Sequence, residues 1–136
     1  MANTREKAPV TVTDTGINGD DLADSPETNA INMEDFALYT RLTLYAKVTQ
    51  GTSTKVYVTA TASNDGVTYY EIPQAASAVT DGNLVMDEME MRWTIGGNRN
   101  LIVDLKDLNH KFIKVKFDDP DDGTGTVIVT GFKSEQ

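Results

Sequence analysis

The stretch TASNDGVTYYEI, residues 61–72, decides the fold, because one alternating run enters it and a second β-rich run leaves it. Between the two runs lies Asn64-Asp65-Gly66. Hairpin turns need residues that tolerate positive φ, and Asp-Gly before a β-rich run is a strong short-range hairpin signal. We therefore predict a hairpin whose return strand covers 67–72 and ends at Pro73, since proline lacks the N–H that a strand ladder needs.

The residues before the hairpin alternate with a period of two. In the run from 36 to 49, one face holds Phe36, Leu38, Leu42, Leu44, Ala46 and Val48, and the other holds Tyr39, Arg41, Thr43, Tyr45, Lys47 and Thr49. After a turn at 50–53, Val56, Val58, Ala60 and Ala62 alternate with Lys55, Tyr57, Thr59 and Thr61. Because successive strand side chains point to opposite faces, both runs are predicted to be strands with one buried face.

The strand pattern continues toward the C-terminus. Residues 84–95 form an expected strand with a bulge near Asp87, where the phase of the apolar residues changes. Further strands are expected at 101–105, 112–117 and 126–132, while 33–38 supplies one helical turn at most. About eight antiparallel strands with short connections and almost no helix indicate an all-β domain, either a sandwich or a barrel.

Residues 1–35 have a different composition from residues 36–136. They are rich in Thr, Asn, Asp and Gly, and outside APVTVT (8–13), which is expected to be one short strand, they show little periodicity. So much turn chemistry is uncommon inside a compact domain. Two interpretations stay open, a disordered arm and an arm that becomes ordered by lying on a neighbouring molecule. The predicted organisation is an extended N-terminal arm, 1–35, and a β-sheet domain, 36–136.

The composition excludes several classes of partner. Lys and Arg number 12 against 21 Asp and Glu, which gives a formal charge of −9. Nucleic-acid binding requires cationic side chains along the phosphates, so we expect none. The absence of cysteine excludes disulfides and thiolate chemistry. The start, MANTREKAPV, is no signal peptide and no run is long enough to span a membrane, so we expect synthesis in the cytoplasm and no membrane partner.

Residues suited to catalysis are scarce in the sequence. The single histidine, His110, follows Asp107 at a strand-entry turn, where a solvated or capping role is the usual one. Carboxylate pairs occur at Asp20-Asp21, Asp87-Glu88, Asp118-Asp119 and Asp121-Asp122. A glycosidase needs two carboxyls across a cleft, which neighbours on one loop do not provide. We therefore expect no enzyme, and no catalytic, cofactor-binding or metal-binding residues.

The acidic segment DDPDDG, 118–123, resembles the start of a calcium loop only superficially. In the EF-hand register that uses Gly123, Pro120 takes a ligand position and Val129 falls where the bidentate Glu belongs, so the match fails. An irregular calcium loop stays open beside a solvated hairpin loop. Its ligands would come from Asp118, Asp119, Asp121 or Asp122.

Aromatic and sulfur side chains give two further expectations. Tyr39, Tyr45, Tyr57 and either Tyr69 or Tyr70 are expected on outward strand faces, where they pack across strands, anchor an interface or stack on sugar. Met86, Met89, Met91 and Trp93 are expected to be core residues, because methionine fills irregular gaps.

The order VYVTATASNDGVTYYEI, KFIKVKF and GTVIVTGF resembles that of small β-sandwich virion proteins of tailed bacteriophages, including jelly-roll capsid decoration proteins. SNDGVTYY is also similar to the S-x-D-G-x-x-[WY] hairpin of discoidin-like, galactose-binding-like sandwiches, whose cysteines and loop arginines this chain lacks. The likeness covers 36–132. It implies an antiparallel β-sandwich, jelly-roll-like, that carries the extended N-terminal arm.

The resemblance also implies a function. The expected role is that of a capsid decoration or cementing protein on the virion surface, whose partner is the shell of major capsid protein. A homo-oligomer is expected, with a trimer on a local three-fold axis favoured. The alternative is a carbohydrate-binding or adhesion module in the head or tail.

Overall fold

The computed structural model describes residues 9–33, 39–72, 78–80, 83–85 and 90–135. These residues form strands and one short 3-10 helix, with no α-helix among them. The elements are β1 (Val10–Thr11), β2 (Asn18–Asp21), η1 (Leu22–Asp24), β3 (Ile31–Asn32), β4 (Arg41–Thr49), β5 (Lys55–Ser63), β6 (Tyr70–Glu71), β7 (Ala78–Thr80), β8 (Asn83–Val85), β9 (Glu90–Thr94), β10 (Arg99–Leu105), β11 (Phe112–Asp118) and β12 (Thr126–Ser134).

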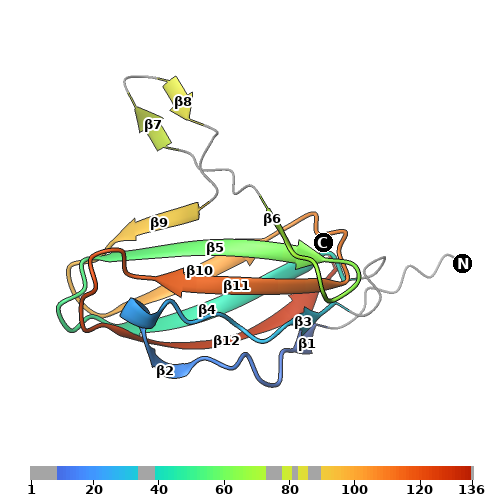
Figure 1. The fold of residues 1–136 in the computed structure, drawn as a ribbon, viewed down its shortest axis with the longest axis horizontal. Coiled ribbons are helices and arrows are strands. Elements are labelled where there is room, and N and C mark those ends of the chain that lie inside the picture. The colour runs from blue at the N-terminus through green and yellow to red at the C-terminus, as the bar shows by residue number, and fades with distance from the viewer. Residues whose placement is uncertain (1–8, 34–38, 73–77, 81–82, 86–89, 136) are drawn as a thin grey trace, which may run out of the picture.

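Two antiparallel sheets pack face to face (Figure 1). Sheet A has the order β1-β12-β4-β10, with β2 also paired to β12. Sheet B has the order β3-β11-β5-β6, with β9 also paired to β5. The predicted all-β, antiparallel sandwich is therefore confirmed.

The chain pairs as one long hairpin that has been rolled up. β12 lies beside β1 and β2, β11 beside β3, β10 beside β4, and β5 beside β6 and β9. Successive pairs lie in opposite sheets, because the chain crosses from one sheet to the other between one pair and the next. This is the strand order of a jelly roll.

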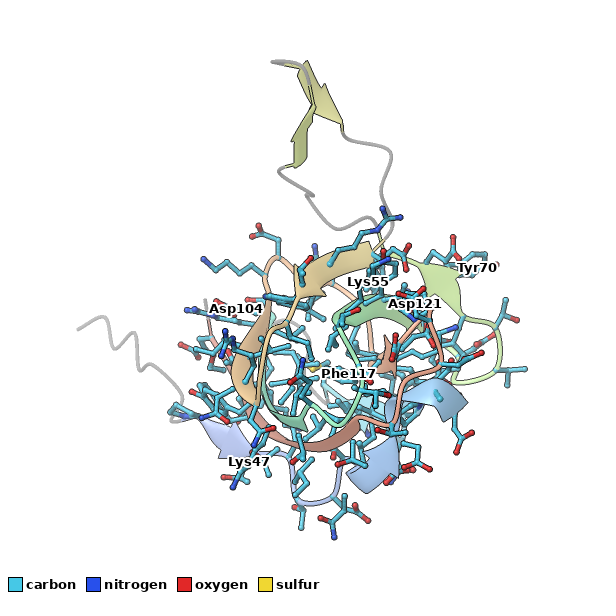
Figure 2. All side chains as sticks on the ribbon, turned by 90° about the vertical axis from the view of Figure 1, so that its left-hand side faces the viewer. Lys47, Lys55, Tyr70, Asp104, Phe117 and Asp121 are labelled. Atoms are coloured by element: carbon cyan, nitrogen blue, oxygen red, sulfur yellow. The ribbon has the colours of Figure 1, made fainter. Side chains whose placement is uncertain are left out.

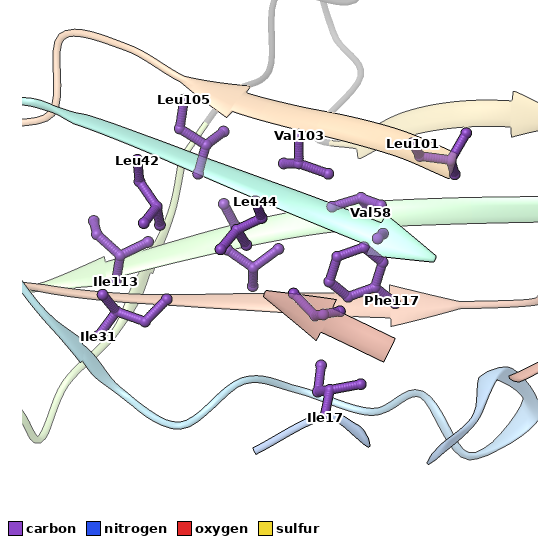
Figure 3. Close-up of a cluster of buried hydrophobic side chains, with 14 of the residues drawn as sticks. Ile17, Ile31, Leu42, Leu44, Val58, Leu101, Val103, Leu105, Ile113 and Phe117 are labelled. Carbon is purple, nitrogen blue, oxygen red and sulfur yellow. The ribbon is translucent and has the colours of Figure 1, made fainter. Parts of the chain in front are cut away.

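Every second side chain of the central strands is buried between the sheets, and these side chains hold the sheets together. Leu42, Leu44, Ala46 and Val48 of β4 are all buried, as are Val56, Val58, Ala60 and Ala62 of β5. Figure 3 shows the side chains from the two sheets meeting between the layers, with Phe117 among them. Burying one Val or Leu side chain contributes roughly 1.5–3 kcal/mol, so the alternation predicted for these strands is the main source of cohesion.

Residues 9–33 of the predicted arm, 1–35, belong to the sandwich, so the division predicted at 35/36 does not separate an arm from a β-sheet domain. Within residues 9–33, Ile17, Leu22, Ile31 and Met33 are all buried in the core. β1 and β2 pair with β12, and β3 pairs with β11, so these residues are ordered by strands of their own chain. The apolar residues are irregularly spaced because the segment crosses from sheet A to sheet B, and that hides them from a periodicity test.

The return strand of the central hairpin is shorter than predicted. The turn forms at 64–66, but β6 contains only Tyr70 and Glu71, and Val67 is 81% exposed. The predicted strand 84–95 is divided into β8, which pairs with β7, and β9, which pairs with β5. The expected bulge near Asp87 and the helical turn after Met33 lie outside the described residues.

β6 and β9 lie one after the other along β5 and form one interrupted strand of sheet B. The Ile72 N–H donates to the Ala60 carbonyl at 2.9 Å, and the next residue of β5, Thr59, pairs with Glu90. Ile72 and Glu90 thus occupy consecutive places along β5, and the chain between them, 73–89, is an insertion that contains β7 and β8. Figure 1 shows the β7–β8 hairpin standing away from the sandwich.

We predict that deleting 73–89 leaves the sandwich intact, with a thermal midpoint within about 5 °C of the full chain, because closing the shorter connection costs less entropy. Joining Ile72 to Glu90 keeps Met91 opposite Val58 on the core side. Circular dichroism on heating measures the outcome.

The matched control is deletion of 73–90, one residue more. It moves every residue of β9 to the opposite face and turns Arg92 toward the core, so it should destabilise the fold strongly. Equal thermal midpoints for the two deletions would contradict the assignment of β6 and β9 to one strand.

Candidate functional site: an outer sheet face and a hairpin cleft

The structure separates the tyrosines that the sequence grouped together. Tyr39 is only 4% exposed, so its predicted place on an outward face is wrong, and its ring lies 5.2 Å from the Lys133 ammonium. Tyr57 and Tyr69 lie under the cations of Arg92 and Lys114, at 4.8 and 4.3 Å from the ring centroids.

Two other tyrosines are open to solvent. Tyr45 is 44% exposed on sheet A and Tyr70 is 71% exposed at the end of sheet B. No single tyrosine platform therefore forms among the described residues, and these two rings lie at different sites.

Tyr45 lies at the centre of an apolar area on the outer face of sheet A. It pairs across the strands with Ile102 on β10, which is 60% exposed. The Phe132 ring lies 5.9 Å from the Tyr45 ring, and Ile128 on the same strand is 39% exposed. We call these four residues the sheet A patch. Exposed apolar areas of this kind mark protein contact sites more often than isolated residues do.

An ion pair borders the sheet A patch. The Arg41 guanidinium donates two hydrogen bonds to Asp104, Nε to Oδ1 at 2.8 Å and Nη2 to Oδ2 at 2.5 Å, and the Thr43 hydroxyl adds a third at 3.2 Å. The hydrogen bond from Arg41 holds the pKa of Asp104 below its usual value. Figure 2 shows Lys47 and Asp104 at the outside of the sandwich, while Phe117 lies inside it.

A cleft of about 420 Å³ opens beside the central hairpin. The residues around it include Asn64, Asp65, Tyr70, Glu71 and His110. The cleft brings the single histidine close to carboxylates that the sequence places far from it. Asp65, Tyr70 and Glu71 are exposed, so the cleft is a surface feature.

Asp65 is held in place by the turn that it caps. Its Oδ1 accepts hydrogen bonds from the N–H groups of Val67 (2.8 Å) and Thr68 (3.0 Å) and from the Ser63 hydroxyl (2.8 Å). The hydrogen bonds from Thr68, Val67 and Ser63 lower the pKa of Asp65 from 3.8 to about 2. With their N–H groups engaged here, Val67 and Thr68 do not join the ladder, which explains the short β6. The Ser63 hydroxyl has a structural role, since it helps to hold Asp65 in the turn.

The acidic loop 118–123 is organised around one buried carboxylate. Asp119 accepts the N–H of Asp121 (2.9 Å) on Oδ1 and the N–H of Gly123 (2.7 Å) on Oδ2. Burial raises the pKa of Asp119, but hydrogen bonds from Ser53 and the two N–H groups outweigh it, and the net pKa lies below the usual value.

Two neighbouring carboxylates are engaged as well. Asp118 accepts the Ser25 hydroxyl and Asp121 pairs with Lys55 at 3.2 Å. In the part of the chain that the structure describes, no group of three metal-ligating side chains gathers.

The remaining sequence candidates are distributed as follows. Asp20 and Asp21 are exposed on β2, and Asp107 is an exposed turn residue with a φ of 55°. Met91 and Trp93 are partly buried against the core, as predicted. Met86, Met89, Asp87 and Glu88 lie outside the described residues.

No protein-family model matches the chain, and no curated protein matches its sequence significantly. Within the described residues, no helix has the length and apolar character of a membrane span. The case for a function therefore depends on the geometry and charge of the two surface features, the sheet A patch and the hairpin cleft.

We predict that Asp65→Asn lowers the thermal midpoint at neutral pH and flattens its acid dependence. Because the folded-state pKa of about 2 lies below the ordinary 3.8, Asp65 stabilises the fold above pH 3.8 and loses that effect as the pH falls toward 2. Thermal midpoints measured across this range for both proteins provide the test.

Glu71→Gln is the control, since it removes a carboxylate from the same cleft without removing a cap of the turn. Parallel curves for the wild type and Asp65→Asn would show that the turn hydrogen bonds do not shift the titration.

Proposed function

We propose that this protein is a non-catalytic structural protein of a tailed-phage virion that decorates or cements the head shell. The observation that carries the proposal is the sheet A patch, an apolar area on the outer face of a rigid sheet. A decoration protein needs a stable body and a broad contact surface more than a cleft. The strand order and the resemblance of 36–132 to virion sandwiches support the same function.

The charge distribution favours the sheet A patch as the contact with the shell. On β4, β10 and β12, the outer face carries Arg41, Lys47 and one carboxylate, Asp104, which Arg41 already pairs. Asp20, Asp21 and Asp24 lie in β2 and η1, at the edge of sheet A opposite β10, and Asp21 lies beside Thr126 of β12. The acidic residues of 118–122 lie at the end of β11 and in the loop before β12. The patch thus offers apolar contact with little net repulsion, as the core of a protein interface requires.

The expected partners follow from this proposal. The major capsid protein is the partner, the virion surface is the location, and neither nucleic acid nor membrane is involved. The trimer that the resemblance favours concerns copies bound around a local three-fold axis of the shell, and it remains a prediction.

We predict that the protein binds empty heads of the phage that encodes it at a fixed stoichiometry and raises the temperature at which those heads open. Tyr45→Ala combined with Ile128→Lys should weaken binding at least about tenfold, because it removes the centre of the contact and buries a charge. Co-sedimentation with the heads measures binding.

Val67→Lys is the matched control, since Val67 is 81% exposed on the central hairpin, away from sheet A. Binding that is lost in the control and retained in the double variant would overturn the assignment of the surface. A wild-type protein that never sediments with the heads would overturn the function.

The hairpin cleft favours a second candidate function, carbohydrate binding. Its exposed Tyr70 ring is suited to stacking on a sugar, and Glu71 and Asn64 provide groups that hydrogen-bond to hydroxyls. A volume of about 420 Å³ is within the range of small-ligand sites.

Under this alternative, the protein should bind glycans on an array with micromolar affinity, and Tyr70→Ala should abolish the signal while Tyr45→Ala leaves it. If loop 118–123 holds calcium in support of that binding, a chelator should reduce the signal. An array without signal at high protein concentration would exclude the alternative.

A further inference from the structure

The four edges of the two sheets are not equivalent. Three of them are interrupted or short: β1 and β2 divide one edge of sheet A, β3 contains two residues, and β6 and β9 are separated by the insertion 73–89. The fourth edge is β10, with seven residues paired to β4 in an unbroken register. Among the described residues, β10 has no strand on its other side.

β10 also lacks the features that usually protect an edge strand. Proteins place proline, lysine, bulges or inward-pointing charges there to prevent pairing with other chains. Arg99-Asn100-Leu101-Ile102-Val103-Asp104-Leu105 contains no proline or lysine, and its one cation, Arg99, lies at the first position of the strand. Its single carboxylate, Asp104, is paired with Arg41, and its central residue, Ile102, is a 60% exposed isoleucine. The edge is long, regular and apolar at its middle.

We propose that β10 is a self-association site, where two copies of this chain pair their β10 strands antiparallel about a two-fold axis at Ile102. In this register Ile102 lies opposite the partner's Ile102, and Leu101 lies opposite the partner's Val103. Asn100 lies opposite the partner's Asp104, so an amide donor faces a carboxylate acceptor.

This self-complementarity is what selects a second copy as the occupant. A contact about a two-fold axis uses the same surface on both molecules, so the strand must match its own reverse. β10 does so at each central position: apolar faces apolar on both sides of the sheet, and the polar pair is complementary. Leu101 and Val103 are core residues at 8% and 0% exposure. Pairing would therefore bring the cores of the two copies next to each other at the shared edge.

Pairing through β10 would join sheet A of both copies into one continuous sheet. The two sheet A patches would then lie on the same outer face, since Ile102 belongs to the patch and to the edge. The association goes beyond the proposed shell binding and is tested without shells, so that either one can fail alone.

The test is sedimentation equilibrium on the full chain at up to about 100 µM, a range in which a contact of micromolar affinity is populated. The wild type is expected to be a dimer. Ile102→Lys and Ile102→Glu should each weaken the dimer at least about tenfold, because like charges directly opposite each other destabilise a strand pair. An equimolar mixture of I102K and I102E chains should dimerise again, since opposite charges then meet at the axis.

Ile128→Lys is the matched control. It adds the same charge to the same face but lies on β12, in the interior of sheet A, and should leave the dimer intact. Circular dichroism checks that each variant is folded.

A monomeric wild type at the highest concentration, a trimer, or a dimer that responds to Ile128→Lys and not to Ile102→Lys would overturn the proposal. Variant chains that stay monomeric when mixed would overturn the two-fold register.

Discussion

The rest of the structure depends on how two sheet-crossing turns are tied together at one end of the sandwich. Residues 50–54 lead from β4 to β5 and residues 119–125 lead from β11 to β12, and both connections cross between the sheets. Thr52 and Thr124 each donate a backbone N–H to the other's hydroxyl, at 2.8 and 2.9 Å, and the Gly125 N–H donates to the Ser53 hydroxyl at 2.9 Å. Gly51 has a φ of 54°, and a Cβ there would lie 2.3 Å from Thr124 Oγ1, so the close approach requires glycine. These bonds fix the distance between the sheets where β4, β5, β11 and β12 meet.

In a jelly roll with these central strands, sequence changes and insertions are tolerated best at the edge strands and at the ends of the sandwich. β4 and β5 have neighbours on both sides, so a change in them disturbs two ladders at once. The insertion 73–89 is accommodated because it leaves from the outer strand of sheet B and returns to the next position along β5. The same reasoning makes β10 distinctive, since an edge that is neither divided nor covered by another described strand is costly to keep unless it has a use.

The sequence predicts the parts of this fold that are local. Alternation in 42–48 and 56–62 identifies the buried faces because period-two burial needs no knowledge of the neighbours. The same alternation misplaces Tyr39, because this residue precedes β4 and the strand pattern no longer applies there. The core residues Ile17 and Leu22 escape a periodicity test because the segment containing them passes between sheets, and its pairing partners lie about a hundred residues away on β12.

The candidate sites are predictable only in part, for a related reason. Asp65 is recognisable as a turn residue, but the cleft beside it also requires His110, which the approach to β11 brings to the hairpin. The sheet A patch combines residues from β4, β10 and β12, and the sequence pattern marks only Tyr45 among them. Neither the exposure of Ile102 nor the open edge of β10 can be read from one strand, because both depend on which strands lie beside it.

The distribution of charge distinguishes the outer face of β4 and β10 from the acidic segments of the molecule. The chain carries a formal charge of −9, so two copies, or one copy and another acidic surface, repel each other over most orientations. On β4 and β10 the carboxylate of Asp104 is neutralised by Arg41, and Lys47 adds a positive charge. Long-range repulsion therefore disfavours approach through the acidic residues of 20–24 and 118–122 more than approach through β4 and β10. The same distribution of charge would thus guide both a second copy and a larger assembly toward the sheet A patch.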